Sequence, residues 1–339
     1  MIFLFNLVFF LVFIYVLKQI SPNLKLIDKP DERKLHTGNI PLIGGLAIYA
    51  NILILLFFFD VSNSLRIIIF TSSILVFLGA IDDSIELGVK FRLLAQLISC
   101  LFIIGFGIQI ETLGYIFLLG ELNLNYFAII FTVFCVIGLT NAFNFIDGID
   151  GLCSSQSLIS MFSILLMIFF YNEYYNFQDI QFIFYVIFII FLFFIFNISN
   201  INKIFLGDAG SMFLGFFIAW LLILFSQGNY KLLNPLLTIW CVTLPVFDII
   251  SVVSRRILNK TNPFIPDREH IHHLFLNMGY SNKFTLIILI VISIFLNLIG
   301  LITFHYLGNS VSLIVFILLS LIYTLIMKFL SNKVSLLSN

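Results

Sequence analysis

The sequence predicts an all-α, polytopic membrane protein with about eleven transmembrane helices in a single membrane-embedded domain, residues 1–339. Two observations lead to this prediction. Hydrophobic residues make up 61% of the 339 residues and charged residues only 10%, far from the averages of soluble domains. Apolar runs of about 20 residues, the length that crosses a bilayer as a helix, follow one another along the chain. Only short polar stretches separate these runs.

The first run has no basic residue before it and Lys18 after it. A cleaved signal peptide starts with a basic region, so we interpret this run as a retained helix. A small outer hairpin is expected in residues 110–125, where Gly114 and Gly120 stand among alternating apolar residues. The eleven expected spans are 2–17, 41–59, 65–81, 93–110, 126–142, 152–170, 181–197, 212–227, 232–253, 284–304 and 311–328.

Basic residues mark one side of the membrane. With alternating crossings, the loops after odd-numbered spans and the C-terminal tail share a side that holds fifteen Lys and Arg residues, against Arg66 and Lys231 on the other. Cytoplasmic loops carry an excess of Lys and Arg, so the rich side is predicted to be cytoplasmic, with the N-terminus outside and the C-terminus inside. Such a face is generic for membrane proteins and does not indicate nucleic acid.

The first cytoplasmic loop reads DKPDERKLHTG at residues 28–38 and IPLIGG at 40–45. It mixes both charge signs with turn formers. One interpretation is a solvated loop in which Gly44 and Gly45 allow close helix packing. The other is a phosphate site, since Lys and Arg bind phosphate oxygens well.

Carboxylates stand at the inner ends of several expected helices. Asp82 and Asp83 directly follow an apolar run, at the interface where ionised groups are costly. Adjacent acids repel unless a cation joins them, and Mg²⁺ accepts one or two carboxylates plus substrate phosphates, so the pair is a candidate metal or general-base site. A solvated helix end is the alternative. Asp208, in FLGDAGS, is either a site acid or, with Ser211, a cap of the next helix.

The most specific stretch is NAFNFIDGIDGL at residues 141–152, where Asn and Asp recur at every third position across a helix end. This spacing stacks polar side chains along one helical face. Gly148 and Gly151 would let the backbone approach a flat or phosphorylated ligand. A turn is the alternative, although turns rarely show this regularity.

The last cytoplasmic loop carries Arg255 and Arg256 and then PDREHIHH at residues 266–273. Three His within four residues suggest zinc, but no Cys partner or H-E-x-x-H spacing accompanies them. Arg and His together bind a diphosphate and stabilise charge that develops on it, so we interpret the loop as a phosphate-binding region. The simplest role for Asp248, an acid inside the preceding apolar run, is an ion pair with Arg255.

All these motifs fall on the side predicted to be cytoplasmic, the only side where a charged cytosolic nucleotide meets a membrane lipid phosphate. In this order and spacing, over residues 28–273, they resemble the motifs of the polyprenyl-phosphate N-acetylhexosamine-1-phosphate transferases. The bacterial branch that uses undecaprenyl phosphate and N-acetylglucosamine is the most similar. The branch that makes lipid I of peptidoglycan has three consecutive His, whereas Ile271 interrupts the run here.

The resemblance implies transfer of GlcNAc-1-phosphate from UDP-GlcNAc to undecaprenyl phosphate with release of UMP. This would be the first membrane step of O-antigen, common antigen or related envelope polysaccharide synthesis. The resemblance also implies Mg²⁺, or Mn²⁺ in its place, and a bacterial inner (cytoplasmic) membrane protein whose active site faces the cytoplasm. The chemistry agrees, because joining two phosphates sets anion against anion and needs a cation. We expect no nucleic-acid partner and leave a homodimer open.

The family motifs carry roles over to matching residues. Asp208 matches the metal ligand, Asp83 supports the metal, and Asp82 is the base or orients the lipid phosphate. The nucleotide-binding residues by the same match are Asn144, Asp147, Gly148, Asp150, Phe205 and Lys34, with His36 beside it. Those expected at the diphosphate and sugar are Arg256, Arg268, His270, His272 and His273.

Two alternatives stay open from the sequence. A proton-coupled transporter also combines many helices with intramembrane acids, but its acids are expected in the middle of helices. A sister transferase that uses another UDP-N-acetylhexosamine is the second alternative, because a few loop residues decide the donor sugar. The sequence leaves the identity of the base and a covalent intermediate open, and we favour direct displacement.

Overall fold

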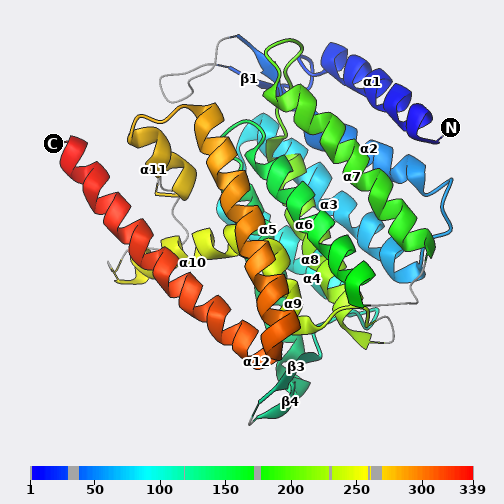
Figure 1. Ribbon diagram of the computed structural model, residues 1–339. Coiled ribbons are helices and arrows are strands. Elements are labelled where there is room, and N and C mark those ends of the chain that lie inside the picture. The colour runs from blue at the N-terminus through cyan, green and yellow to red at the C-terminus, as the bar shows by residue number, and fades with distance from the viewer. Residues whose placement is uncertain are drawn as a thin grey trace.

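The structure, a computed structural model, describes residues 2–29, 38–117, 119–171, 177–228, 231–258, 260 and 269–338. Long helices dominate it (Figure 1), because without water only a helix satisfies the backbone polar groups of a segment from within. In the described chain, eight helical segments are long and apolar enough to cross a membrane. They are α1 (Ile2–Ile20), α3 (Asn63–Ile85), α5 (Ala128–Ile146), α6 (Leu152–Tyr171), α7 (Phe177–Ile198), α8 (Gly207–Ser226), the α9–α10 segment (Pro235–Leu258) and α12 (Asn282–Ser338).

The other expected spans are shorter or joined to a neighbour. Helices α2 (Gly44–Leu55) and α4 (Val89–Ile104) have 12 and 16 residues. In α12 the last two expected spans form one element with two arms, seen as a V in orange and red in Figure 1, because Gly308 at φ 78° interrupts the helix. The α9–α10 segment comprises α9 (Pro235–Thr238), η3 (Ile239–Val242) and α10 (Thr243–Leu258). Each of the eleven predicted runs therefore contains helix, while the number of crossings stays a prediction.

Helix α8 forms the centre of the bundle, and its apolar window is completely buried. Helices α2, α3 and α5 pack against it. Glycines permit the close approach: a Cβ on Gly45 would lie 2.2 Å from the Gly210 nitrogen, and a Cβ on Gly79 would lie 2.4 Å from the Ala209 Cα. The close packing predicted for the glycine pair of the first loop is confirmed. The start of α8 is thereby held against two other helices.

Two short antiparallel ribbons lie at opposite ends of the bundle (Figure 1). One joins β1 (Ile27–Asp28) to β2 (Ile40–Pro41). The other joins β3 (Thr112–Ile116) to β4 (Gly120–Asn123), followed by η1 (Asn125–Phe127), which confirms the predicted hairpin. The short helix α11 (Ile271–Asn277) lies at the β1 end, and the bend of α12 lies beside β3 (Figure 1). The molecule therefore has one end built from the long predicted cytoplasmic loops and one built from the hairpin.

Candidate active site

A cavity of about 1960 Å³ lies at the β1 end of the bundle. All five loops predicted to be cytoplasmic contribute to its wall. Their lining residues include Asp28, Lys29, Asp82, Asp83, Arg92, Asn144, Asp147, Gly148, Asp150, Lys203, Phe205, Asp208 and His273. The structure therefore brings together in one space most of the residues that the motifs single out.

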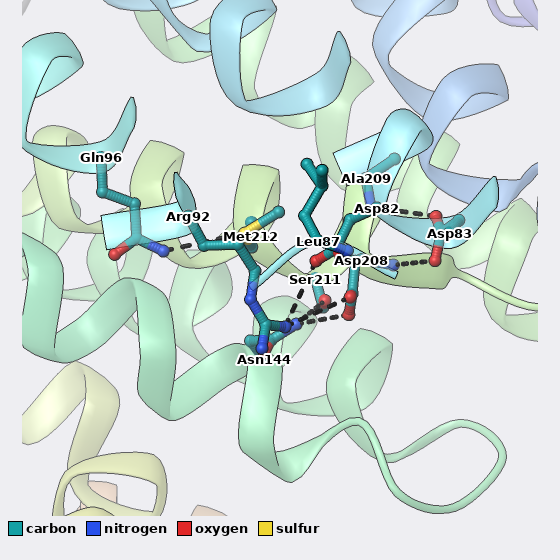
Figure 2. Close-up of polar contacts among 10 residues, drawn as sticks. All are labelled: Asp82, Asp83, Leu87, Arg92, Gln96, Asn144, Asp208, Ala209, Ser211 and Met212. Carbon is teal, nitrogen blue, oxygen red and sulfur yellow. Dashed lines mark hydrogen bonds and ion pairs between the residues drawn. The ribbon is translucent and has the colours of Figure 1, made fainter. Parts of the chain in front are cut away.

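Three carboxylates meet where the end of α3 approaches the start of α8 (Figure 2). We call Asp82, Asp83 and Asp208, with Arg92 and Asn144, the carboxylate cluster. The Arg92 Nη1 lies 3.3 Å from Asp82 Oδ2 and 3.4 Å from Asp208 Oδ2. Asn144 donates to Asp208 Oδ1 at 2.7 Å, and the backbone N–H of Leu87 donates to Asp82 Oδ1 at 2.5 Å. One guanidinium thus serves two of three acids.

Asp83 faces the backbone of α8. Its two oxygens accept the backbone N–H groups of Asp208 and Ala209 at 2.9 and 3.3 Å. From the sequence, capping by side chains of α8 itself was one interpretation, whereas the structure supplies the acceptor from α3. Gly207, at φ 73°, makes room, since a Cβ there would lie 2.5 Å from Asp83 Oδ2. The acid stabilises the positive end of the α8 dipole and fixes Asp208 relative to α3.

The donor set of the carboxylate cluster fits a divalent cation of the Mg²⁺ type. In the part of the chain that the structure describes, no group of three or more His, Cys, Asp or Glu forms a complete metal site. Proteins hold Mg²⁺ through one or two carboxylates, while substrate phosphates and water complete the octahedron. The Asp208 side chain is 33% exposed, and among the described residues it shares its ion-pair partner, Arg92, with Asp82. The carboxylates of Asp82 and Asp208 therefore offer more acceptor oxygens than the Arg92 guanidinium pairs with.

Helix α5 ends inside the Asn and Asp stretch. Asn144 lies in its last turn, but Asp147, at φ −77° and ψ 48°, terminates the helix. The predicted stack along one helical face therefore stops at Asn144, because the two glycines that follow favour turns. The pKa of Asp147 is well above its usual range, since desolvation and the charges of nearby carboxylates, first of all Asp208, disfavour ionisation.

Asp150 and Phe205, both predicted to bind the nucleotide, share one wall of the cavity. The Nζ of Lys203 lies 2.6 Å from Asp150 Oδ2 and 5.1 Å from the centre of the Phe205 ring. Asn197 joins the same two segments: its Oδ1 accepts the N–H of Gly151 at 2.6 Å, and its Nδ2 donates to the carbonyl that precedes Phe205 at 2.9 Å. An aromatic face and a carboxylate are thus held next to each other.

His270, His272 and His273, here called the histidine row, lie side by side. The ring centres of His270 and His272 are 6.1 Å apart and those of His272 and His273 are 4.1 Å apart. Only His273 lines the cavity, and the other two rings are buried. The pKa of His272 is well below its usual value, because burial and the neighbouring imidazoles disfavour protonation. Gly148 leaves space for this ring, since a Cβ there would lie 2.0 Å from His272 Nε2.

Some predicted site residues lie elsewhere, and others were missed. Arg256 is buried and is not among the described residues of the cavity wall. Arg92 and Lys203 were not predicted as site residues. A signal for Arg92 exists: only three residues separate α3 from α4 (Val89–Ile104), so the first turn of α4 lies near the end of α3 that carries Asp82. The predicted residues that lie outside the described part of the chain are Lys34, His36 and Arg268.

The chain is similar to known bacterial proteins. The sequence profile of the family described as Glycosyl transferase family 4 matches residues 65–226. The undecaprenyl-phosphate alpha-N-acetylglucosaminyl 1-phosphate transferase of Yersinia pestis is 31% identical over 87% of this chain and 81% of its own length. The protein of that name from Escherichia coli strain K12 is 31% identical over 89% of this chain and 84% of its own length. The one from Haemophilus influenzae is 32% identical over 88% of this chain and 85% of its own length.

The chain belongs to glycosyl transferase family 4. This membership confirms the family resemblance predicted from the motifs. The segment that matches the glycosyl transferase family 4 profile contains the carboxylate cluster and the Asn and Asp stretch, while the histidine row lies beyond its end.

Proposed function

We propose that this protein transfers N-acetylglucosamine-1-phosphate from UDP-GlcNAc to undecaprenyl phosphate and releases UMP. The carboxylate cluster is the observation that carries the proposal. It places three acids, one guanidinium and one amide on the wall of a cavity at one end of a membrane-spanning bundle. The names of the relatives state this transfer for those proteins.

In the proposed reaction, an oxygen of the lipid phosphate attacks the phosphorus that carries the sugar. The bond from this phosphorus to the bridging oxygen breaks, and UMP leaves with the electron pair. Asp208 would hold the divalent cation, Mg²⁺ or Mn²⁺, with Asp83 in support. Such a cation, when bound, would screen the two anionic reactants and stabilise the leaving phosphate. Asp82 orients the lipid phosphate or accepts its proton, and Arg92 neutralises charge between the acids.

The donor nucleotide is assigned to the part of the cavity wall that Phe205 and Asp150 form. We place the uracil ring against Phe205, with Asp150 as a hydrogen-bond acceptor and Asn144, Asp147 and Gly148 along its edge. Lys203 lies over the Phe205 ring, so it must move when a base stacks there. The diphosphate and sugar are assigned to the histidine row with Arg256. Lys34 and Arg268 are assigned by motif match alone.

We infer that the cavity end faces the cytoplasm of a bacterial inner membrane. The excess of Lys and Arg in its loops supports this orientation, because cytoplasmic loops carry such an excess. The position of the acids supports an enzyme over a transporter. Asp82 and Asp83 lie in the last turn of α3 and Asp208 in the first turn of α8, rather than mid-helix. Acids at helix ends suit catalysis at the membrane surface.

The test is an assay of UMP release. Purified protein in lipid is incubated with Mg²⁺, undecaprenyl phosphate and one UDP-sugar at a time. We expect UMP with UDP-GlcNAc and much less with other UDP-N-acetylhexosamines. Preference for another donor would identify a sister transferase, and no UMP with any donor would refute the transferase.

A further inference from the structure

Asp248 is a buried acid that the proposed reaction does not use. It lies in the membrane-spanning segment Pro235–Leu258 and is 2% exposed. An ionisable group in such a place is costly and is retained where it has a defined partner. The sequence suggested Arg255 as the partner of Asp248, but the structure shows a different partner. Arg255 forms an ion pair with Glu269 and donates to its carbonyl oxygen at 3.1 Å.

Asp248 instead contacts the start of the histidine row. Its Oδ2 lies 2.7 Å from His270 Nδ1, and its Oδ1 accepts the backbone N–H of Ile271 at 3.0 Å. Tyr323 on the second arm of α12 donates its hydroxyl to the same Oδ1 at 3.2 Å. Asp248 and Arg255 are seven residues apart, so both lie on one face of α10. Together they hold residues 269–271 against α10.

The contact with Asp248 determines which nitrogen of His270 carries its proton. An ionised carboxylate only accepts hydrogen bonds, so the Nδ1 that faces it must be the protonated nitrogen. In the neutral ring, Nε2 is then the acceptor. Acids that orient a functional imidazole in this way fix its tautomer and the plane of its ring. Phe145 packs against the same ring, with centres 5.3 Å apart, and further limits its rotation.

The histidine row extends from the fixed His270 ring to the cavity. His270 lies next to His272, and His272 next to His273, which lines the cavity. A shift of the His270 ring is therefore expected to displace the two neighbouring rings. We propose that Asp248 is a positioning residue that fixes the Nδ1-protonated tautomer of His270 and holds the histidine row at the cavity. The kinetic consequence rests on the proposed function, whereas the tautomer does not.

The variant Asp248→Asn separates anchoring from control of the tautomer. Its one carbonyl oxygen still accepts the Ile271 N–H, so the start of α11 stays attached. Its amide group then presents N–H donors to His270, which can accept them only with an unprotonated Nδ1.

The direct readout is ¹⁵N NMR of histidine-labelled protein in lipid. The chain has only 5 His residues, so the His270 signal is assigned by its loss in His270→Gln. We expect a protonated Nδ1 in the wild type and an unprotonated Nδ1 in Asp248→Asn. A wild-type His270 protonated on Nε2 alone, or the same Nδ1 state in both proteins, would overturn the proposal.

Kinetics test the consequence for the proposed transfer. We expect Asp248→Asn to lower kcat by about 10–100-fold, the usual cost of losing an acid that orients a functional histidine, and to leave UMP affinity within about twofold. Asp248→Glu should restore part of kcat. The matched control is Asp179→Asn, because Asp179 is also a 2% exposed acid that accepts a backbone N–H, from Ser62 at 2.8 Å, but in α7.

A kcat within twofold of wild type in Asp248→Asn, or an equal fall in Asp179→Asn, would reduce Asp248 to a structural group. If the wild type itself releases no UMP, the proposed function fails. The NMR comparison still decides the tautomer in that case.

Discussion

The carboxylate cluster and the histidine row border the same cavity but are built in opposite ways. In the cluster, Asp82 and Asp208 share one guanidinium, and the Asp208 side chain is 33% exposed on the cavity wall. In the row, the buried His270 ring contacts one buried acid, Asp248, whose hydrogen bonds come from the protein itself. The cluster therefore has room for an external cation, whereas the row needs none. Variants that affect only the carboxylate cluster or only the histidine row test the cation site and the positioning role of Asp248 separately.

The largest effect is expected for Asp208→Asn. Loss of a metal-binding carboxylate removes about 4 kcal/mol of transition-state stabilisation, so turnover should fall about 10³-fold in the UMP assay. The fold should persist, because Asp83 bonds the backbone of residue 208 and not its side chain. Asp60→Asn is the control, since Asp60 is 90% exposed and pairs with Arg66 away from the cavity. Near-normal turnover in Asp208→Asn would refute the metal assignment.

Metal dependence of stability distinguishes the two regions without any turnover. A ligand present at about 100 times its Kd stabilises the folded state by about 2.7 kcal/mol. We expect Mg²⁺ or Mn²⁺ to raise the Tm of the wild type and of Asp248→Asn, and a chelator to reverse the rise. Asp208→Asn should show no such rise. An equal rise in Asp208→Asn would place the cation elsewhere.

Much of this arrangement could be predicted from the sequence. The apolar runs gave the helices, and the short motifs between them gave the residues that gather at the cavity, because each motif follows a helix end on the same side. What could not be predicted depends on the direction in which a side chain leaves its helix. Asp82 and Asp83 are adjacent, yet one faces Arg92 and the other the backbone of α8.

The partner of Asp248 illustrates the same limit. Seven-residue spacing places Asp248 and Arg255 on one helical face, and the sequence alone allows them to be read as a pair. In the structure they bind successive residues of another segment, Glu269 and His270. That segment follows a loop whose path no periodicity specifies. By contrast, the break between the last two expected spans, 284–304 and 311–328, agrees with the structure, because Gly308 interrupts α12 between them.

A smaller effect is expected where the Asn and Asp stretch meets the histidine row. A Cβ on Gly148 would overlap the His272 ring, and overpacking of this kind costs about 1–3 kcal/mol. Gly148→Ala should therefore lower kcat/KM for UDP-GlcNAc about tenfold, through displacement of the row. Gly138→Ala in α5 is a matched control, because a Cβ there meets nothing within 4 Å. Equal kcat/KM in the two variants would show that the row tolerates displacement.

The smallest effect concerns stability and separates the two adjacent acids. Asp83→Ala removes the acceptor of two backbone N–H groups at the start of α8, and loss of a cap costs about 0.5–2 kcal/mol. Asp82→Ala also loses a backbone hydrogen bond, from Leu87, but that group lies in the loop after α3 and can be solvated. Thermal unfolding in detergent should therefore show a lower Tm for Asp83→Ala than for Asp82→Ala. The reverse order would mean that Asp83 serves the metal more than the helix, and the cluster would then have a second carboxylate with a primary role in cation binding.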